Sequence, residues 1–196
     1  TLIIENETDS NFNATLGDSA HSVNLVKKGA GRKTLKKDFP VKSGTLRVEG
    51  GTFDFGEYAT GWTGVTLAGG TAVFGGTDNI IRSSTVTVAD PAAEGVIAIA
   101  NGVTVMADHL YLGEEARQAT GYHGGAASAA PAENKLACFD ATATGLLLLN
   151  NPYEVTIDGD RTLTDAEKDL LVNNRIGKFT KKGSGRLTLD GSLEGY

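Results

Sequence analysis

Short alternating runs of apolar and polar residues make up most of this chain. They include "TLRVEG" from Thr45, "VTLAGG" from Val65, "TVTVAD" from Thr85 and "RLTLDG" from Arg186. Apolar residues fall at every second position of each run, which is the period of a strand with one buried face. Each run closes on Gly or Asp, residues that tolerate turn conformations. Strands this short, separated by so many turns, predict an all-β fold.

The runs recur at a regular distance along the chain. "VEGGTFDFG" begins at Val48, and the similar "LAGGTAVFG" begins at Leu67. The step between them also places Phe55 over Phe74. Several very short strands in a repeat of about 20 residues are typical of a solenoid, in which each coil buries its apolar side against the next. We therefore expect a β-solenoid with coils of about 19 residues.

A longer step extends the same alignment. Twice this period places residues 65–75 over residues 103–113, and the run at 85–90 covers the coil between them slightly out of register. A β-sandwich is the alternative all-β architecture. Its strands are usually longer, at about five to six residues, and are joined by hairpins. Hairpin dipeptides are few in this chain, so the internal similarity favours the solenoid.

Two segments interrupt the strand pattern. Residues 113–135 are rich in Ala, Gly and Ser and predict a long loop insertion, with room for one helical turn within Glu114 to Ala119. Long loops in compact domains tend to carry function. Further on, Thr164 and Glu167 have the spacing of a helix capping box. We expect one short helix from Asp165 to about Val172.

One phrase occurs twice in the chain. "LVKKGAGRKTL" occupies residues 25–35, and "FTKKGSGRLTL" occupies residues 179–189. Together with "GTLRVEGGTFDFG" at residues 44–56, they resemble the autotransporter-associated β-strand repeat, which runs apolar-x-Lys-x-Gly-x-Gly-x-Leu-x-Leu. The second copy matches this pattern throughout, whereas the first has Lys33 where Leu is usual. The resemblance implies a right-handed parallel β-helix from a large bacterial surface or secreted protein.

The resemblance also implies a role for the whole chain. We expect residues 1–196 to form a single β-solenoid module that is a fragment of a larger repeat protein on the bacterial outer surface or outside the cell. It would act as a non-enzymatic structural spacer or adhesin-like passenger segment, facing a host or environmental glycan or a protein surface. Unpaired strand edges at cut coils add the expectation of end-to-end self-association. The repeated phrase itself is a structural device that turns a corner.

Charge and composition narrow the classes of partner. The formal net charge is -6, which argues against a nucleic-acid binder. Eight of the 18 Lys and Arg residues lie between Lys27 and Arg47, and five between Arg175 and Arg186, where we expect solvated charges on strand faces. No apolar stretch reaches membrane-spanning length, so direct membrane insertion is not expected. The single cysteine, Cys138, is predicted to be a small core residue.

A search for catalytic and metal-binding patterns yields no site. No nucleophile motif or cofactor-binding loop is present, and the histidines have no partners at helical spacing: His21, His109 and His123. The acidic pair in Asp158-Gly159-Asp160 is typical of a turn, with calcium binding as the weaker alternative. We therefore predict no enzyme, and no catalytic, cofactor-binding or metal-binding residue.

The alternative function is a carbohydrate-active or carbohydrate-binding β-helix. A lyase or hydrolase groove would lie near the insertion at 113–135, and its nearest candidates are Asp108, Arg117, Tyr122 and His123. Binding without cleavage could instead use the rings of Trp62 and Tyr58, if the turn between their coils exposes them. For Trp62, a core or turn-packing role is favoured over stacking on a sugar.

Overall fold

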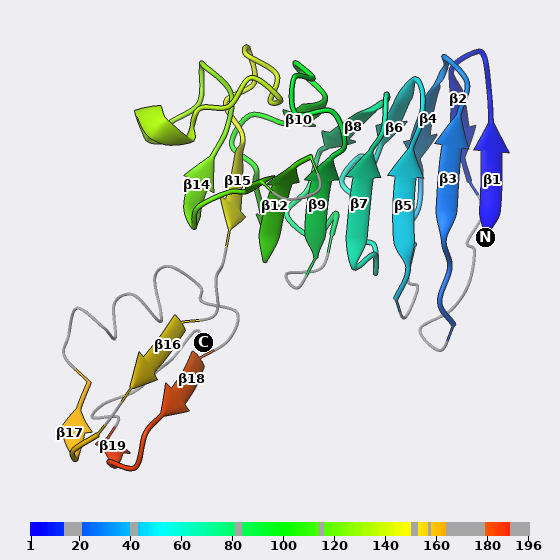
Figure 1. The fold of residues 1–196 in the computed structure, drawn as a ribbon. Helices are drawn as coiled ribbons and strands as arrows, with labels where there is room; N and C mark the ends of the chain where they lie inside the picture. Colours follow the sequence, from blue (N-terminus) through cyan, green and yellow to red (C-terminus); the bar gives the residue numbers. More distant parts are fainter. Residues whose placement is uncertain are drawn as a thin grey trace. The chain divides into compact units, whose positions relative to one another are not determined.

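The computed structural model is an all-β solenoid of stacked coils joined by parallel sheets (Figure 1). It describes residues 1–13, 21–39, 43–80, 84–113, 116–149, 153–156, 158–163 and 179–188. The chain divides into two compact units, Thr1–Leu149 and Asn150–Tyr196, and each is described by itself. One continuous module over residues 1–196 therefore stays a prediction.

Two long sheets form the walls of the first unit. The larger contains β1 (Leu2–Glu5), β3 (Leu25–Lys28), β5 (Thr45–Val48), β7 (Gly64–Leu67), β9 (Thr85–Val88), β12 (His109–Leu112) and β13 (Ala116–Arg117). The second contains β2 (Ser10–Phe12), β4 (Arg32–Leu35), β6 (Thr52–Asp54), β8 (Thr71–Phe74) and β10 (Ile97–Ile99). Each coil places one strand in each wall, and successive coils wind right-handed in Figure 1, as expected.

A third sheet and the second unit complete the described strands. The third sheet orders β11 (Thr104–Ala107), β15 (Leu146–Leu149) and β14 (Gly121–His123), and a short 3₁₀ helix, η1, spans Ala132–Asn134. In the second unit, β16 (Tyr153–Thr156) pairs in parallel with β18 (Phe179–Lys182), and β17 (Arg161–Thr162) with β19 (Leu187–Thr188). None of the described residues form a helix long and apolar enough to span a bilayer.

The core is built from rows of like side chains. Wall strands such as β5 and β7 alternate inward and outward residues, and stacking places Leu46 on Leu25 and Val65 on Leu46. The rings of Phe55 and Phe74 stack with centroids 4.6 Å apart, which confirms the alignment of these two positions. Burial of such rows, at about 25 cal/mol per Å² of apolar surface, is the main stabilising term.

The coils are longer than the sequence predicted. They average about 23 residues over about six turns. The step from Thr45 to its partner Gly64 has the expected length, but the step from Thr85 to its partner His109 is longer. The strands keep nearly the same length from coil to coil, whereas the turns vary in length. The 19-residue period was too small because it came from one pair of short coils.

The longer alignment is wrong for the same reason. Val65 pairs with Val86, and Val86 with Leu110, so residues 85–90 are the next coil in register. Residues 103–113 are not equivalent to 65–75, because β11 lies in the third sheet whereas β7 lies in the first, and β12 lies in the first sheet whereas β8 lies in the second. Insertions at turns had shifted the apparent repeat.

The insertion after β12 is a folded excursion from the regular coils. β11 pairs directly with β15, although the whole excursion separates these two strands along the chain. Between them, β13 pairs antiparallel with β12, and β14 pairs antiparallel with β15. The expected helical turn within Glu114 to Ala119 is wrong at 116–117, which is β-strand; residues 114–115 lie outside the described residues, as does the short helix expected from Asp165 to Val172.

Candidate functional site

The repeated phrase builds a turn around a buried lysine. Lys27 faces inward from β3 and is fully buried. Its Nζ donates to the carbonyl oxygens of Lys28 at 2.6 Å, Gly29 at 2.8 Å and Gly50 at 3.2 Å. Burial lowers the pKa of Lys27; Glu7 opposes this shift, and Lys33 adds to it. Each of the three ammonium protons thus has a carbonyl acceptor, and one acceptor, the Gly50 carbonyl, belongs to the next coil.

Glycine and acidic residues complete this turn. Gly29 adopts a positive φ of 76°, which disfavours other residues. A Cβ on Gly31 would collide with the Thr8 carbonyl of the preceding coil. That coil also supplies Asp9, whose Oδ1 accepts the backbone N–H of Arg32 at 2.8 Å. The phrase is therefore bonded to the coils on both of its sides.

The second copy of the phrase forms a similar turn in the second unit, although its lysine, Lys181, is exposed. Lys181 Nζ donates to the carbonyl of Gly183, whose φ is 81°. A Cβ on Gly185 would collide with Gly159, and Asp160 Oδ1 accepts the N–H of Arg186 at 2.6 Å. The acidic pair weighed as a calcium turn thus contributes Asp160 as a backbone cap. No three His, Cys, Asp or Glu side chains among the described residues could hold a metal ion.

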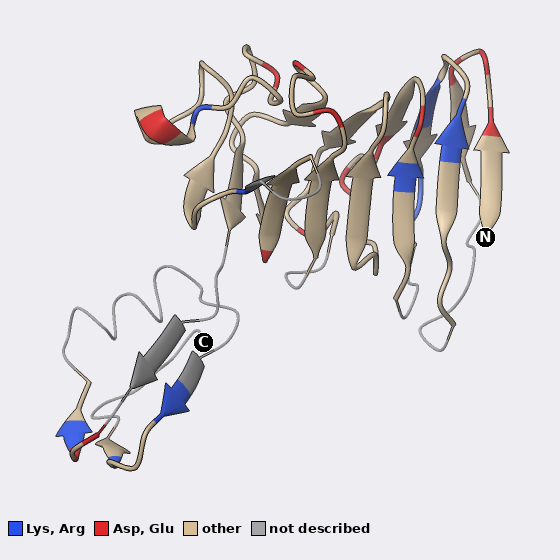
Figure 2. Ribbon diagram, in the orientation of Figure 1, with Lys and Arg blue, Asp and Glu red and all other residues tan. Residues whose placement is uncertain are grey.

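Basic residues of the first phrase pair with acids of the next coil. Lys28 lies 3.3 Å from Glu49, and Arg32 lies 2.7 Å from Asp54. Arg47 also contacts Glu49, and these two basic neighbours lower the Glu49 pKa, Arg47 more strongly. Figure 2 shows the basic ends of β3 and β5 with acidic segments nearby. These charges join adjacent coils along the strand face.

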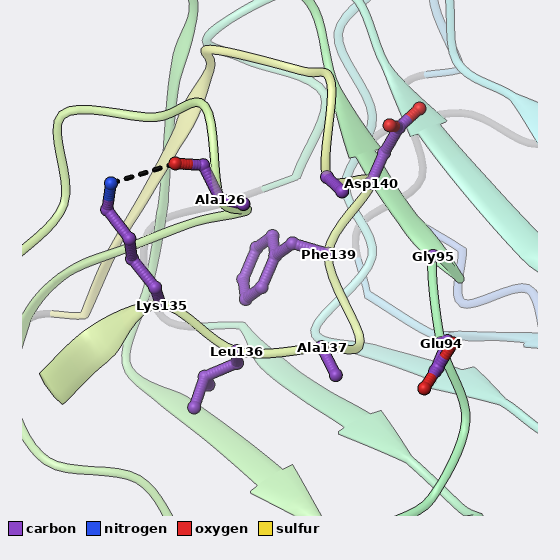
Figure 3. A pocket seen from close by; sticks show the side chains of 9 residues that line it. Glu94, Gly95, Ala126, Lys135, Leu136, Ala137, Phe139 and Asp140 are labelled. Atoms are coloured by element: carbon purple, nitrogen blue, oxygen red, sulfur yellow. Dashed lines mark hydrogen bonds between the residues drawn. The ribbon is translucent and has the colours of Figure 1, made fainter. Parts of the chain in front are cut away.

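A separate feature is a cavity beside the excursion. It has a volume of about 630 Å³ and is open to solvent (Figure 3). Its lining comes from the turn before β10 and from residues between β14 and β15: Glu94, Gly95, Ala126, Lys135, Leu136, Ala137, Phe139, Asp140 and Ala141. The cavity therefore lies where the chain departs from the regular coils of the first unit.

The cavity has an apolar floor and charged edges. In Figure 3 the Phe139 ring lies between Lys135 on one side and Glu94 and Asp140 on the other. Lys135 Nζ donates to the Ala126 carbonyl at 2.8 Å. Asp140 accepts both the backbone N–H and the hydroxyl of Thr142, which hold its pKa below the usual value. The arrangement suits a small polar molecule with one apolar face.

The residues suggested for a catalytic groove do not line this cavity. Asp108 is half-buried, and burial raises its pKa against the opposing charges of His109 and Arg117. Tyr122 is exposed. His123 is buried; its Nε2 bonds the carbonyl of Ala119 at 2.8 Å, while burial lowers its pKa. A catalytic groove at these four residues near the insertion therefore stays a prediction.

Trp62 has the core role that the sequence favoured over stacking on a sugar. Trp62 has 0% exposure and packs against Phe39, Phe53 and Phe55, so its ring belongs to the core. Tyr58 is half-buried against the same core. Cys138 is buried as predicted, and burial raises its thiol pKa to about 11. Core packing accounts for the role of Trp62.

The sequence had missed the residues that line the cavity. Phe139 and Asp140 lie in a short run that resembles the wall strands, and no spacing distinguished them. The role of Lys27 was also missed, although its recurrence in both phrases was an available signal. No family model, curated protein or solved structure matches this chain.

Proposed function

We propose that this chain is a non-enzymatic β-solenoid segment of a bacterial surface or secreted protein, serving as a spacer that presents its excursion. The observation that carries the proposal is that the phrase is bonded to the preceding coil in the same way in both units, through Asp9 and Arg32 in the first and through Asp160 and Arg186 in the second. A turn that bonds one coil to the next suits a protein whose task is to extend.

Mechanical considerations support a spacer. Each coil contacts its neighbours through parallel backbone ladders, and charge pairs such as Lys28–Glu49 and Arg32–Asp54 reinforce them. Like side chains stack along the core, so bending the array would separate several rows at once. The excursion between β12 and β15 departs from these walls and offers a distinct surface to a partner.

Location is tested by labelling. Antibodies raised against the folded chain are applied to intact and permeabilised cells of the organism that makes it, beside an antibody against a cytoplasmic protein. We expect labelling of intact cells, or recovery of the chain from the medium. Labelling that requires permeabilisation, as for the cytoplasmic control, would refute a surface or secreted role.

Glycan binding at the cavity is a second candidate. The observation that favours it is the Phe139 floor beside Glu94, Lys135 and Asp140. The lowered pKa of Asp140 keeps its carboxylate ionised, which suits acceptance of hydrogen bonds from sugar hydroxyl groups. Binding is tested by retention of the chain on a panel of immobilised polysaccharides. Glycan binding is supported if Asp140→Asn weakens retention while Glu57→Gln, at an exposed acid outside the cavity lining, leaves it unchanged. A loss of polymer length would contradict the non-enzymatic proposal.

A further inference from the structure

The negative charge of the chain is concentrated in the segment that forms the cavity. Residues 90–145, between β9 and β15, contain seven Asp and Glu residues but only two Lys and Arg residues. Their net charge of -5 accounts for most of the chain's net charge of -6. Glu94 and Asp140 line the cavity itself, and Glu133 lies on η1, which is acidic in Figure 2. The field of this segment therefore attracts cations and repels anions.

The charged groups of the cavity can still bond a ligand. Asp140 receives both bonds from Thr142 on Oδ1, which leaves Oδ2 able to accept another. The carboxylate of Glu94 is exposed and makes no hydrogen bond or ion pair with the residues that the structure describes. On the opposite side of the cavity, Lys135 gives one proton to the Ala126 carbonyl and keeps two (Figure 3). The cavity thus offers acceptors on one side and donors on the other.

Backbone bonds hold the acidic side of the cavity in place. The Gly95 N–H donates to the Ala137 carbonyl at 2.9 Å, and the Asp140 N–H donates to the Ile97 carbonyl at 2.8 Å. These bonds join the turn that carries Glu94 to the segment that carries Asp140. The two carboxylates are therefore brought to the same side before any ligand arrives, which lowers the entropic cost of binding.

The size and floor of the cavity favour a sugar ring over a single amino-acid side chain. The volume of about 630 Å³ is larger than one Lys or Arg side chain would fill. Between the charged groups, the lining consists of Ala126, Ala137 and Ala141 and the edge of the nearly buried Phe139 ring. A pyranose ring suits this surface because it carries C–H groups on its faces and polar groups on its rim.

We propose that the cavity binds a cationic glycan, built from amino sugars whose amines carry no acetyl group. This inference rests on the glycan-binding candidate given above and names its class of ligand. A protonated amine lies between Glu94 and Asp140, the C–H face of the same sugar lies on the alanines, and a hydroxyl oxygen accepts a proton from Lys135. Acetylation removes the charge of the amine, so the acetylated form of the same glycan loses this attraction.

Two hexasaccharides with one backbone provide a matched test by titration calorimetry on the whole chain. They are the hexamers of β-1,4-linked glucosamine and of β-1,4-linked N-acetylglucosamine, compared at a mildly acidic pH at which the amines are protonated and the carboxylates ionised. We expect the glucosamine hexamer to bind about tenfold more tightly, and added salt to reduce this preference. Glu94→Gln should weaken its binding about threefold, whereas Glu57→Gln, the same substitution outside the cavity lining, should leave it unchanged.

The possible outcomes separate this inference from the glycan-binding candidate. If both hexamers bind equally, glycan binding stands and the preference for free amines is refuted. If neither hexamer binds while another polysaccharide of the panel retains the chain, the class of ligand is wrong. Binding to none of them would refute the glycan-binding candidate as well. A lysine hexapeptide that binds as tightly as the glucosamine hexamer would show that the segment attracts any polycation, which would also overturn the proposal.

Discussion

Replacing Lys27 by methionine tests the central structural claim. Lys27→Met keeps most of the aliphatic stem and removes the ammonium that bonds Lys28, Gly29 and Gly50. Each charge-assisted bond contributes about 1.5 kcal/mol or more. Removing the ammonium from water costs about 2–3 kcal/mol, at the low end of the desolvation penalty of a buried ion, and offsets part of this stabilisation. We therefore expect the free energy of unfolding to fall by about 2 kcal/mol.

Urea denaturation followed by tryptophan fluorescence measures this change in the first unit. Trp62 is the one tryptophan of the chain and lies buried in the core of this unit. The matched control is Lys28→Met, the same substitution one residue along on the outward face. Its ion pair with Glu49 is partly exposed, so its loss should cost at most about 0.5 kcal/mol.

The urea midpoints of the two variants show whether the Lys27 ammonium stabilises the first unit. If Lys27→Met unfolds at the same urea concentration as Lys28→Met, the three carbonyls do not need the ammonium, and the buried lysine is not a source of stability. A change in the slope of the transition rather than its midpoint would instead indicate an altered denatured state. Far-UV circular dichroism before denaturation confirms that both variants keep the sheets.

Three further substitutions probe the turn, the core and the excursion. Gly31→Ala should destabilise by about 2 kcal/mol because its Cβ meets the Thr8 carbonyl, whereas Gly159→Ala, in open space, should be nearly neutral in thermal melting. Trp62→Ala should cost about 3–5 kcal/mol and Trp62→Phe far less, since the indole N–H has no hydrogen-bond partner among the described residues; equal losses by circular dichroism would contradict this. Burial lowers the folded-state pKa of His123, so the free energy of unfolding should fall as pH drops below about 6.5. The urea midpoint measured against pH tests this. If a His123→Gln chain shows the same dependence of the midpoint on pH, His123 is not the cause.

The sequence predicted the solenoid but not its period. Alternation in runs such as Thr45–Val48 and Thr85–Val88 identifies strands because each wall buries one face of every strand. Turn length is set by local chemistry at each corner and varies from coil to coil. An alignment that assumes constant turns therefore loses register within two coils, as it did at residues 103–113.

The candidate site was less accessible to sequence reasoning. The insertion gave its approximate place, but the cavity forms where residues around Glu94 meet residues 126–141, and no local pattern links these segments. For Trp62 the core role favoured from the sequence is confirmed, but its Gly-rich turn did not show that Phe39 and Phe53 would be its partners. Side chains whose role depends on distant neighbours lack a periodic signature.

The phrase recurs because it satisfies needs that a single coil cannot meet. Its glycines bring two turns into backbone contact, since a Cβ on Gly31 would collide with the Thr8 carbonyl, and buried carbonyl oxygens at such a contact need hydrogen-bond donors. Lys27 supplies donors to its own turn and to the next, while Asp9 of the preceding coil takes the N–H of Arg32. In the first unit a coil with this phrase is thus stabilised by both of its neighbours. In the first unit the phrase therefore takes a carboxylate from the coil on one side and gives an ammonium proton to a carbonyl of the coil on the other side, and contacts of this kind on both sides favour growth by stacking.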